Sequence, residues 1–155
     1  MEKLTFTEKG FQKLQLEIES LEKKLRKVQA QTAEAAEIGG NQWHDNASYD
    51  NIVIETRGLD SRLSKAHETL NKAQVVATPS RSDLVAIGTS VTIKLRGKIK
   101  TWEIAGFGES DPDARIISYN TPLASILMGK KKGDIAYGKI GGSETKIEIL
   151  NISLS

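Results

Sequence analysis

The feature that most constrains this chain is a pair of heptad seams in its first half. In each seam, apolar or small residues recur in alternating steps of three and four residues, which keeps one face of a helix against a partner helix. The first seam comprises Phe11, Leu14, Ile18, Leu21, Leu25, Val28, Thr32 and Ala35, and the second comprises Tyr49, Ile52, Thr56, Leu59, Leu63, Ala66, Leu70 and Ala73. Between them, Gly39-Gly40-Asn41-Gln42 favours a turn. The two seams therefore predict an antiparallel helical hairpin with arms of about 40 Å.

The ends and the interior of these helices carry further signals. Thr5 can cap the first helix, and Glu8 three residues later completes a capping box. Gly58 interrupts the second helix and costs about 1 kcal/mol relative to alanine.

The second half of the chain changes to a period of two. Thr78-Pro79-Ser80 reads as a linker, and after it Val91, Ile93 and Leu95 fall on one face of a strand. Arg96-Gly97-Lys98 reads as a turn, and Thr121-Pro122 reads as the cap and first residue of a helix. The expected strands are 90–95, 99–104, 115–119, 134–140 and 145–150, with one short helix over 123–128.

These patterns predict an α+β chain: an N-terminal antiparallel coiled-coil hairpin followed by a small antiparallel β domain with one short helix. We expect the hairpin at residues 1–76, a linker at 77–82 and the β domain at 83–155.

Composition excludes several classes of protein. The chain has 155 residues and no cysteine, so it can form neither disulfides nor thiolate metal sites. No apolar run approaches the length of about 18 residues that a membrane span needs, so we expect no membrane association and a cytoplasmic location. Net charge is +2, which is too small to indicate nucleic-acid binding by itself.

The sequence offers little for catalysis by this chain alone. Its only histidines are His44 and His67, and it contains no HExxH, P-loop or glycine-rich dinucleotide motif. We therefore expect that it is not an enzyme. Lys130-Lys131-Lys132 is either a solvated turn after a helix end or a contact for an acidic partner.

The predicted hairpin tip holds the residues with the most functional interest. Trp43 at an exposed turn indicates either contact with a partner or a side chain that closes the open end of the hairpin. His44 lies beside it. Asp45 is a candidate metal ligand, but one carboxylate is a poor site, and capping of the second helix by Asp45 or Asn46 is the favoured interpretation.

The chain resembles the Gre transcript-cleavage factors over nearly its whole length. Its opening, from Leu4 to Leu14, is similar to the start of that family, and Asn46-Ala47-Ser48-Tyr49 resembles the family's Asn-Ala-Glu-Tyr. The most specific similarity is a C-terminal signature made of Ser118, Tyr119, Asn120, Thr121, Pro122, Leu123 and Ala124, then Leu127-Met128-Gly129 and Gly133-Asp134.

The resemblance implies a partner and a mechanism. The C-terminal domain would be FKBP-like and would dock on the rim of the secondary channel of RNA polymerase. The implied docking residues are Ser118, Asn120, Thr121, Pro122, Leu123, Ala124 and Gly129. The hairpin would enter the channel as a monomer and reach the nascent RNA 3′ end indirectly, with Trp43, His44, Asn46 and Tyr49 as contacts at the tip. Asp45 would help to hold Mg²⁺ only jointly with the polymerase, and no cofactor is expected to bind this chain tightly.

The tip departs from the family pattern in ways that weaken the cleavage prediction. Gln42 stands where the family usually has its first acid, so Asp45 lacks a second carboxylate. Ser48 replaces a glutamate, and Ala36 and Val53 replace flanking basic residues. A regulator that occupies the channel without stimulating cleavage is therefore an alternative. A hairpin chaperone or scaffold is a more distant one.

Overall fold

The structure is a computed structural model that describes residues 2–39 and 47–155. It contains two compact units, of which the first comprises residues 1–2 and Gln12–Lys72 and the second comprises Lys3–Phe11 and Ala73–Ser155. We call these the hairpin and the β unit. The described elements are β1 (Leu4–Phe6), α1 (Glu8–Gly39), α2 (Ala47–Lys72), β2 (Ala73–Val75), β3 (Thr89–Leu95), β4 (Lys98–Ala105), the 3₁₀ turn η2 (Pro112–Ala114), β5 (Ile116–Ser118), α3 (Pro122–Leu127), β6 (Ile135–Ile140) and β7 (Ser143–Leu154). The predicted α+β class is confirmed.

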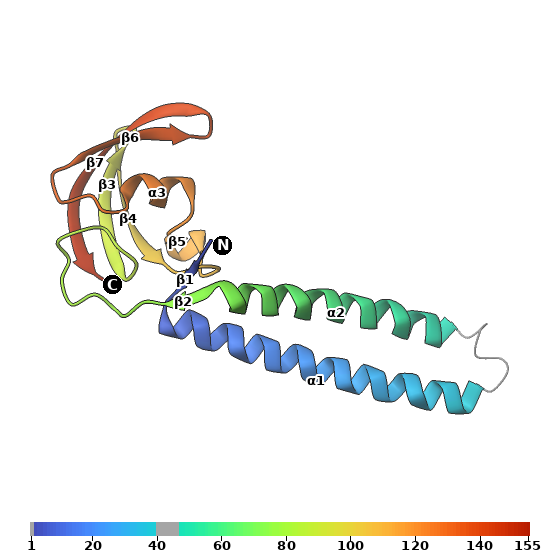
Figure 1. Cartoon of the computed structure of the whole chain (residues 1–155). Helices are drawn as coiled ribbons and strands as arrows, with labels where there is room; N and C mark the ends of the chain where they lie inside the picture. The colour runs from blue at the N-terminus through green and yellow to red at the C-terminus, as the bar shows by residue number, and fades with distance from the viewer. Residues whose placement is uncertain (1, 40–46) are drawn as a thin grey trace. The chain divides into compact units, whose positions relative to one another are not determined.

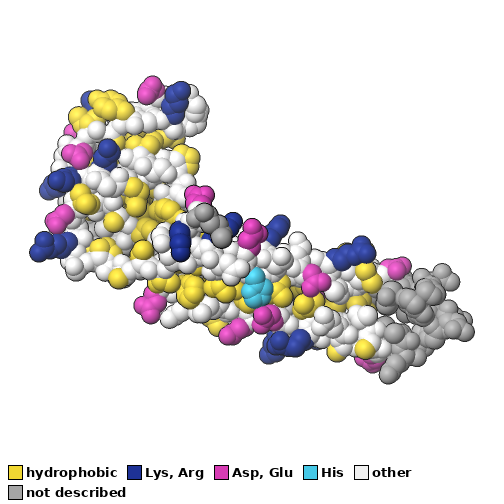
Figure 2. All heavy atoms as spheres, in the orientation of Figure 1, with side chains coloured by type: hydrophobic (Ala, Val, Ile, Leu, Met, Phe, Trp, Pro, Cys, Tyr) yellow, Lys and Arg dark blue, Asp and Glu magenta, His cyan; other side chains and the backbone are white. Residues whose placement is uncertain are grey.

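In the hairpin, α1 and α2 run antiparallel and side by side, as the heptad seams predict (Figure 1). Among the described residues, the buried seam positions are Leu14, Ile18, Leu21 and Val28 of α1 and Leu59 and Ala66 of α2. Figure 2 shows hydrophobic side chains along the line between the helices, with charged side chains on the outside. A single stripe on each helix thus supplies the packing of this unit.

The start of α1 differs from the prediction. Thr7, and not Thr5, caps the helix, because the Thr7 hydroxyl oxygen accepts a hydrogen bond from the Gly10 N–H at 3.1 Å. Thr5 lies in β1, where its N–H donates to the Tyr119 hydroxyl at 3.0 Å and its carbonyl accepts from the Phe107 N–H at 2.7 Å. The predicted cap at Thr5 is wrong because its backbone groups are used by a strand.

The strand β1 pairs in parallel with β2, and this short pair was not predicted. Leu4 lies opposite Ala73 and Phe6 lies opposite Val75. Phe6 is buried, and its ring makes edge-to-face contacts with Phe107 at 5.6 Å and with Phe11 at 6.3 Å between centroids. Aromatic packing therefore holds the N-terminal strand within the β unit.

The main sheet of the β unit has the strand order β5-β4-β3-β7-β6. The ladders β3–β4, β3–β7 and β6–β7 are antiparallel, whereas β4–β5 is parallel, so the sheet is mostly and not wholly antiparallel. Arg96 and Gly97 adopt positive φ angles of 52° and 78° between β3 and β4, as a tight two-residue hairpin turn requires. The predicted turn at this position is confirmed.

The core of the β unit lies between this sheet and α3, around which the sheet curls (Figure 1). The buried core residues are Val85, Val91, Ile93, Ile104, Ile117, Ala124, Leu127, Ala136, Ile147, Ile149 and Ile152. The cap of α3 by Thr121 and the proline at its first position are as predicted. Neither long helix in the described part of the chain has the length and hydrophobicity that a membrane-spanning segment needs.

Candidate functional site

The predicted tip residues cannot be placed. Trp43, His44, Asp45 and Asn46, together with Gln42, lie outside the described residues. Tyr49 lies within α2, but its side chain is also outside the description. The tip contacts, the metal role of Asp45 and the cap at Asp45 or Asn46 therefore stay predictions. Within residues 2–39 and 47–155, no cluster of three His, Asp or Glu side chains suited to a metal ion occurs.

The C-terminal signature folds into one connected hydrogen-bond network between β5 and α3. The Thr121 hydroxyl donates to the Ser118 carbonyl at 2.8 Å, and its oxygen accepts the Ala124 N–H at 3.4 Å. The Ser118 hydroxyl donates to Asn120 Oδ1 at 2.6 Å, and the Ser118 N–H donates to the Ser110 hydroxyl at 2.9 Å. These bonds fix the turn that leads into α3.

The seven predicted docking residues divide by exposure into two sets. Ser118 and Ala124 are buried, and Thr121 is half-buried with its hydroxyl occupied by the helix cap. The predicted docking residues that face solvent are Asn120, Pro122 and Gly129, with Leu123 half-buried. The buried set shapes this face, whereas the exposed set offers the surface that a partner can touch.

Leu123 also lines a groove of about 250 Å³ beside α3. Its floor includes Ile93 and Leu95 of β3 and the half-buried Trp102 of β4. Three cationic side chains, Arg96, Lys98 and Lys100, complete its lining. In the antiparallel register Ile93 lies opposite Lys100 and Leu95 opposite Lys98, so cations border the apolar strip on one side. The groove suits a partner surface that is apolar with acidic flanks.

A second network, centred on Glu109, was missed by sequence reasoning. One carboxylate oxygen accepts from the Thr7 hydroxyl at 2.7 Å, and the other accepts from the Gly106 N–H at 2.7 Å. A Cβ atom at Gly10 would lie 2.7 Å from the Glu109 carboxyl carbon, and one at Gly106 would lie 2.3 Å from a carboxylate oxygen. At Gly106 the added atom would also lie 2.8 Å from the Thr7 backbone nitrogen, so glycine is required there, whereas at Gly10 it would meet only the Glu109 carboxylate. No local pattern signals this contact, because Thr7 and Glu109 are 102 residues apart in the sequence.

Two family descriptions match the chain and together cover most of it. The one described as "Transcription elongation factor, N-terminal" matches residues 4–75, and "Transcription elongation factor, GreA/GreB, C-term" matches residues 80–154.

Individual relatives agree with this. Transcription elongation factor GreA of Nitratiruptor sp. is 34% identical over 155 residues, which cover 97% of this chain and 93% of that protein. GreA of Thermomicrobium roseum is 30% identical over 136 residues, which cover 86% of each protein. Among solved structures, the GreA factor homolog Gfh1 of Thermus thermophilus is 17% identical with a TM-score of 0.47, over 97% of this chain and 99% of that one.

Proposed function

Because the chain belongs to the GreA/GreB family of transcription elongation factors, we propose that it binds RNA polymerase at the rim of the secondary channel and modulates elongation by inserting its hairpin there. In this proposal the chain has no active site of its own and acts through that of the polymerase. The observation that carries the proposal is that both parts of such a factor occur in one chain, over residues 4–75 and 80–154.

The docking half of the proposal is supported by the face around α3. The groove beside Leu123 has an apolar floor and cationic side chains. Asn120 and Pro122, which shortly precede Leu123 in the sequence, are exposed. A polymerase surface with apolar residues flanked by carboxylates would satisfy both features. The turn held by Ser118 and Thr121 preorganises the backbone of this face, which reduces the conformational entropy lost on binding.

In this proposal, binding to polymerase depends on Pro122, which is exposed at the docking face. We expect Pro122→Asp to weaken binding to polymerase by about tenfold, because it places a carboxylate and a flexible backbone at the docking face. Asn151→Asp is the matched control, since Asn151 is exposed on β7 opposite Thr92, outside the signature, and gains the same charge. The measurement is equilibrium binding of the full chain to core polymerase, after circular dichroism has shown that both variants are folded. Equal affinities for the two variants would contradict docking at this face.

The tip favours weak cleavage or none. A hard divalent ion prefers several oxygen ligands with carboxylate charge, but the sequence places only Asp45 and the neutral Gln42 at the family's acidic positions. This donor set does not fit a magnesium site, and we derive no step of the reaction through the ion. The alternative of a non-cleaving channel regulator is favoured by the same pair of residues.

Transcript cleavage in a backtracked elongation complex tests the tip directly. We expect the unaltered protein to stimulate cleavage weakly, and Asp45→Ala to abolish the remainder while binding stays within about twofold. Gln42→Asp should raise cleavage because it supplies the second carboxylate. Strong cleavage that Asp45→Ala does not reduce would overturn this account of the tip, and failure to bind polymerase at all would overturn the proposed function.

A further inference from the structure

Thr32 and Thr56 place polar hydroxyl groups in the largely apolar seam of the hairpin. The Thr32 hydroxyl donates to the Val28 carbonyl at 3.0 Å, and the Thr56 hydroxyl donates to the Ile52 carbonyl at 2.8 Å. Each hydroxyl is satisfied within its own helix, and such bonds to the preceding turn slightly destabilise a helix. Only the methyl groups remain to pack across the seam at these positions.

A hollow of about 330 Å³ lies at this level of the hairpin. It is lined by Gln29 and Thr32 of α1 and by Val53, Thr56 and Arg57 of α2. The hollow is open to solvent, so the side chains that border it contact water on one side and gain less packing than buried seam residues do.

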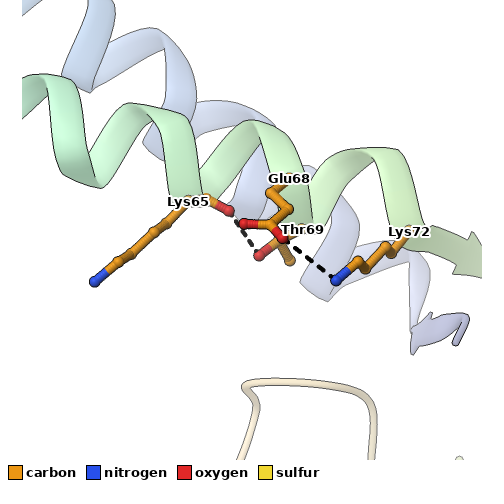
Figure 3. Close-up of polar contacts among 4 residues, drawn as sticks. All are labelled: Lys65, Glu68, Thr69 and Lys72. Atoms are coloured by element: carbon orange, nitrogen blue, oxygen red, sulfur yellow. Dashed lines mark hydrogen bonds and ion pairs between the residues drawn. The ribbon is translucent and has the colours of Figure 1, made fainter. Parts of the chain in front are cut away.

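Beyond this hollow, toward Leu21 and Leu59, several seam residues are buried, whereas Leu25 and Leu63 are half-buried. Leu21, Val28 and Leu59 are 6%, 4% and 5% exposed. His67 Nε2 lies 3.6 Å from a Glu22 carboxylate oxygen across the two helices. The last turns of α2 carry a Glu68–Lys72 pair at 3.5 Å on their outer face (Figure 3). We call the part of α2 from Leu59 to Lys72 the proximal segment and the part from Ala47 to Gly58 the distal segment.

The distal segment is also a poor helix by composition. It contains the β-branched run Ile52-Val53-Ile54, then Thr56 and Gly58, all of which disfavour helix relative to alanine. The facing part of α1, residues 28–37, holds Ala30, Ala33, Ala35 and Ala36, which favour helix. Weak packing and weak propensity coincide on α2 but not on α1.

We propose that the distal segment of α2 unfolds and refolds as a separate unit while α1 and the proximal segment stay helical. The length of paired helix at the end of the hairpin is then set by a local folding equilibrium. This property belongs to the free chain and does not depend on the proposed binding to polymerase.

Hydrogen exchange of the full chain, followed by mass spectrometry and corrected for intrinsic rates, tests the proposal. We expect amides of residues 50–58 to exchange at least about tenfold faster than those of residues 60–70, as a separate low-stability unit requires. Residues 29–36 of α1 flank the same hollow and should exchange more slowly than 50–58. Equal exchange in 29–36 and 50–58 would mean that both helix ends simply fray, and equal exchange along the whole of α2 would mean that it opens as one; either result would overturn the proposal.

Two substitutions separate propensity from packing. Gly58→Ala adds a methyl group that meets nothing within 4 Å, so it should slow exchange in residues 50–58 by about fivefold through helix propensity alone. The double change Thr32→Leu and Thr56→Leu fills the hollow and should slow exchange in the same residues. Ser64→Ala, on the exposed face of the proximal segment, is the control and should leave residues 50–58 unchanged. If Gly58→Ala slows the proximal and distal segments equally, the two are one cooperative unit and the proposal fails.

Discussion

The hairpin and the β unit bury their apolar side chains in different ways. In the hairpin, each helix buries one stripe against a single partner, and the outer faces of both helices remain in solvent. In the β unit, a curled sheet surrounds α3 and residues from strands far apart in the sequence meet in one core. Within the described residues, each helix of the seam has one partner helix at each level, and the hollow at Thr32 and Thr56 is open to solvent. A core with several partners distributes such defects.

The comparison predicts that replacing a buried leucine by alanine lowers the free energy of unfolding by different amounts in the two units. Leu127→Ala should have the largest effect, lowering the free energy of unfolding by about 4 kcal/mol, because Leu127 is 0% exposed in the core around α3. Denaturant unfolding, monitored by Trp102 fluorescence in a Trp43→Phe background, measures this. Ser125→Ala on the exposed side of α3 is the control and should change stability by less than about 0.5 kcal/mol.

Leu21→Ala in the hairpin should cost less, about 2 kcal/mol, because water can reach part of the space that the side chain leaves beside a two-helix seam. The loss should be seen in helical circular dichroism at lower denaturant than in the Trp102 signal. Leu16→Ala tests the same chemistry on the outer face of α1, where Leu16 is 64% exposed, and should be nearly neutral. A cost for Leu21→Ala equal to that of Leu127→Ala would remove the distinction between seam and core.

Glu109→Gln should have the smallest effect, about 1 kcal/mol, because an amide can keep only one of the two acceptor oxygens that now serve Thr7 and Gly106. The carboxylate also lies at the N-terminus of α1, where negative charge is favourable. Hydrogen exchange of the Gly10 and Phe11 backbone amides should become faster, whereas exchange of the α2 amides should not change. Glu109→Asp is the comparison, since it keeps the charge but shortens the reach; uniform quickening along α1 and α2 would contradict a role confined to the first turn.

Sequence reasoning succeeded where one physical signal dominated. The heptad spacing of Leu14, Ile18 and Leu21 identified the seam, and Thr121-Pro122 identified the start of α3, because periodicity and capping are local properties. It failed where distant segments compete for the same residues. Thr5 has the composition of a helix cap, but its partners lie at Phe107 and Tyr119. The parallel pairing of β5 with β4 likewise depends on contacts that no local pattern reports.

The candidate site was predicted less completely than the fold. The signature from Ser118 to Gly129 was identified as one unit, but its sequence does not reveal that Ser118 and Ala124 face inward while Pro122 faces solvent. That division follows from the hydrogen-bond network and from the packing of α3 against the sheet, both of which are set by the tertiary structure. The docking role of these residues stays a prediction.

The pairing of β1 with β2 makes the hairpin an insertion within the β unit. The chain leaves the β unit after Phe11 and returns at Ala73, and Phe6 and Val75 lie in register where the two chain segments meet. A matched deletion or addition of seven residues in each helix preserves the heptad seam and changes the hairpin by about 10 Å, without altering the spacing at this junction. Reach is thus a separable property of this architecture: hairpins of graded length can be built on one unchanged β unit.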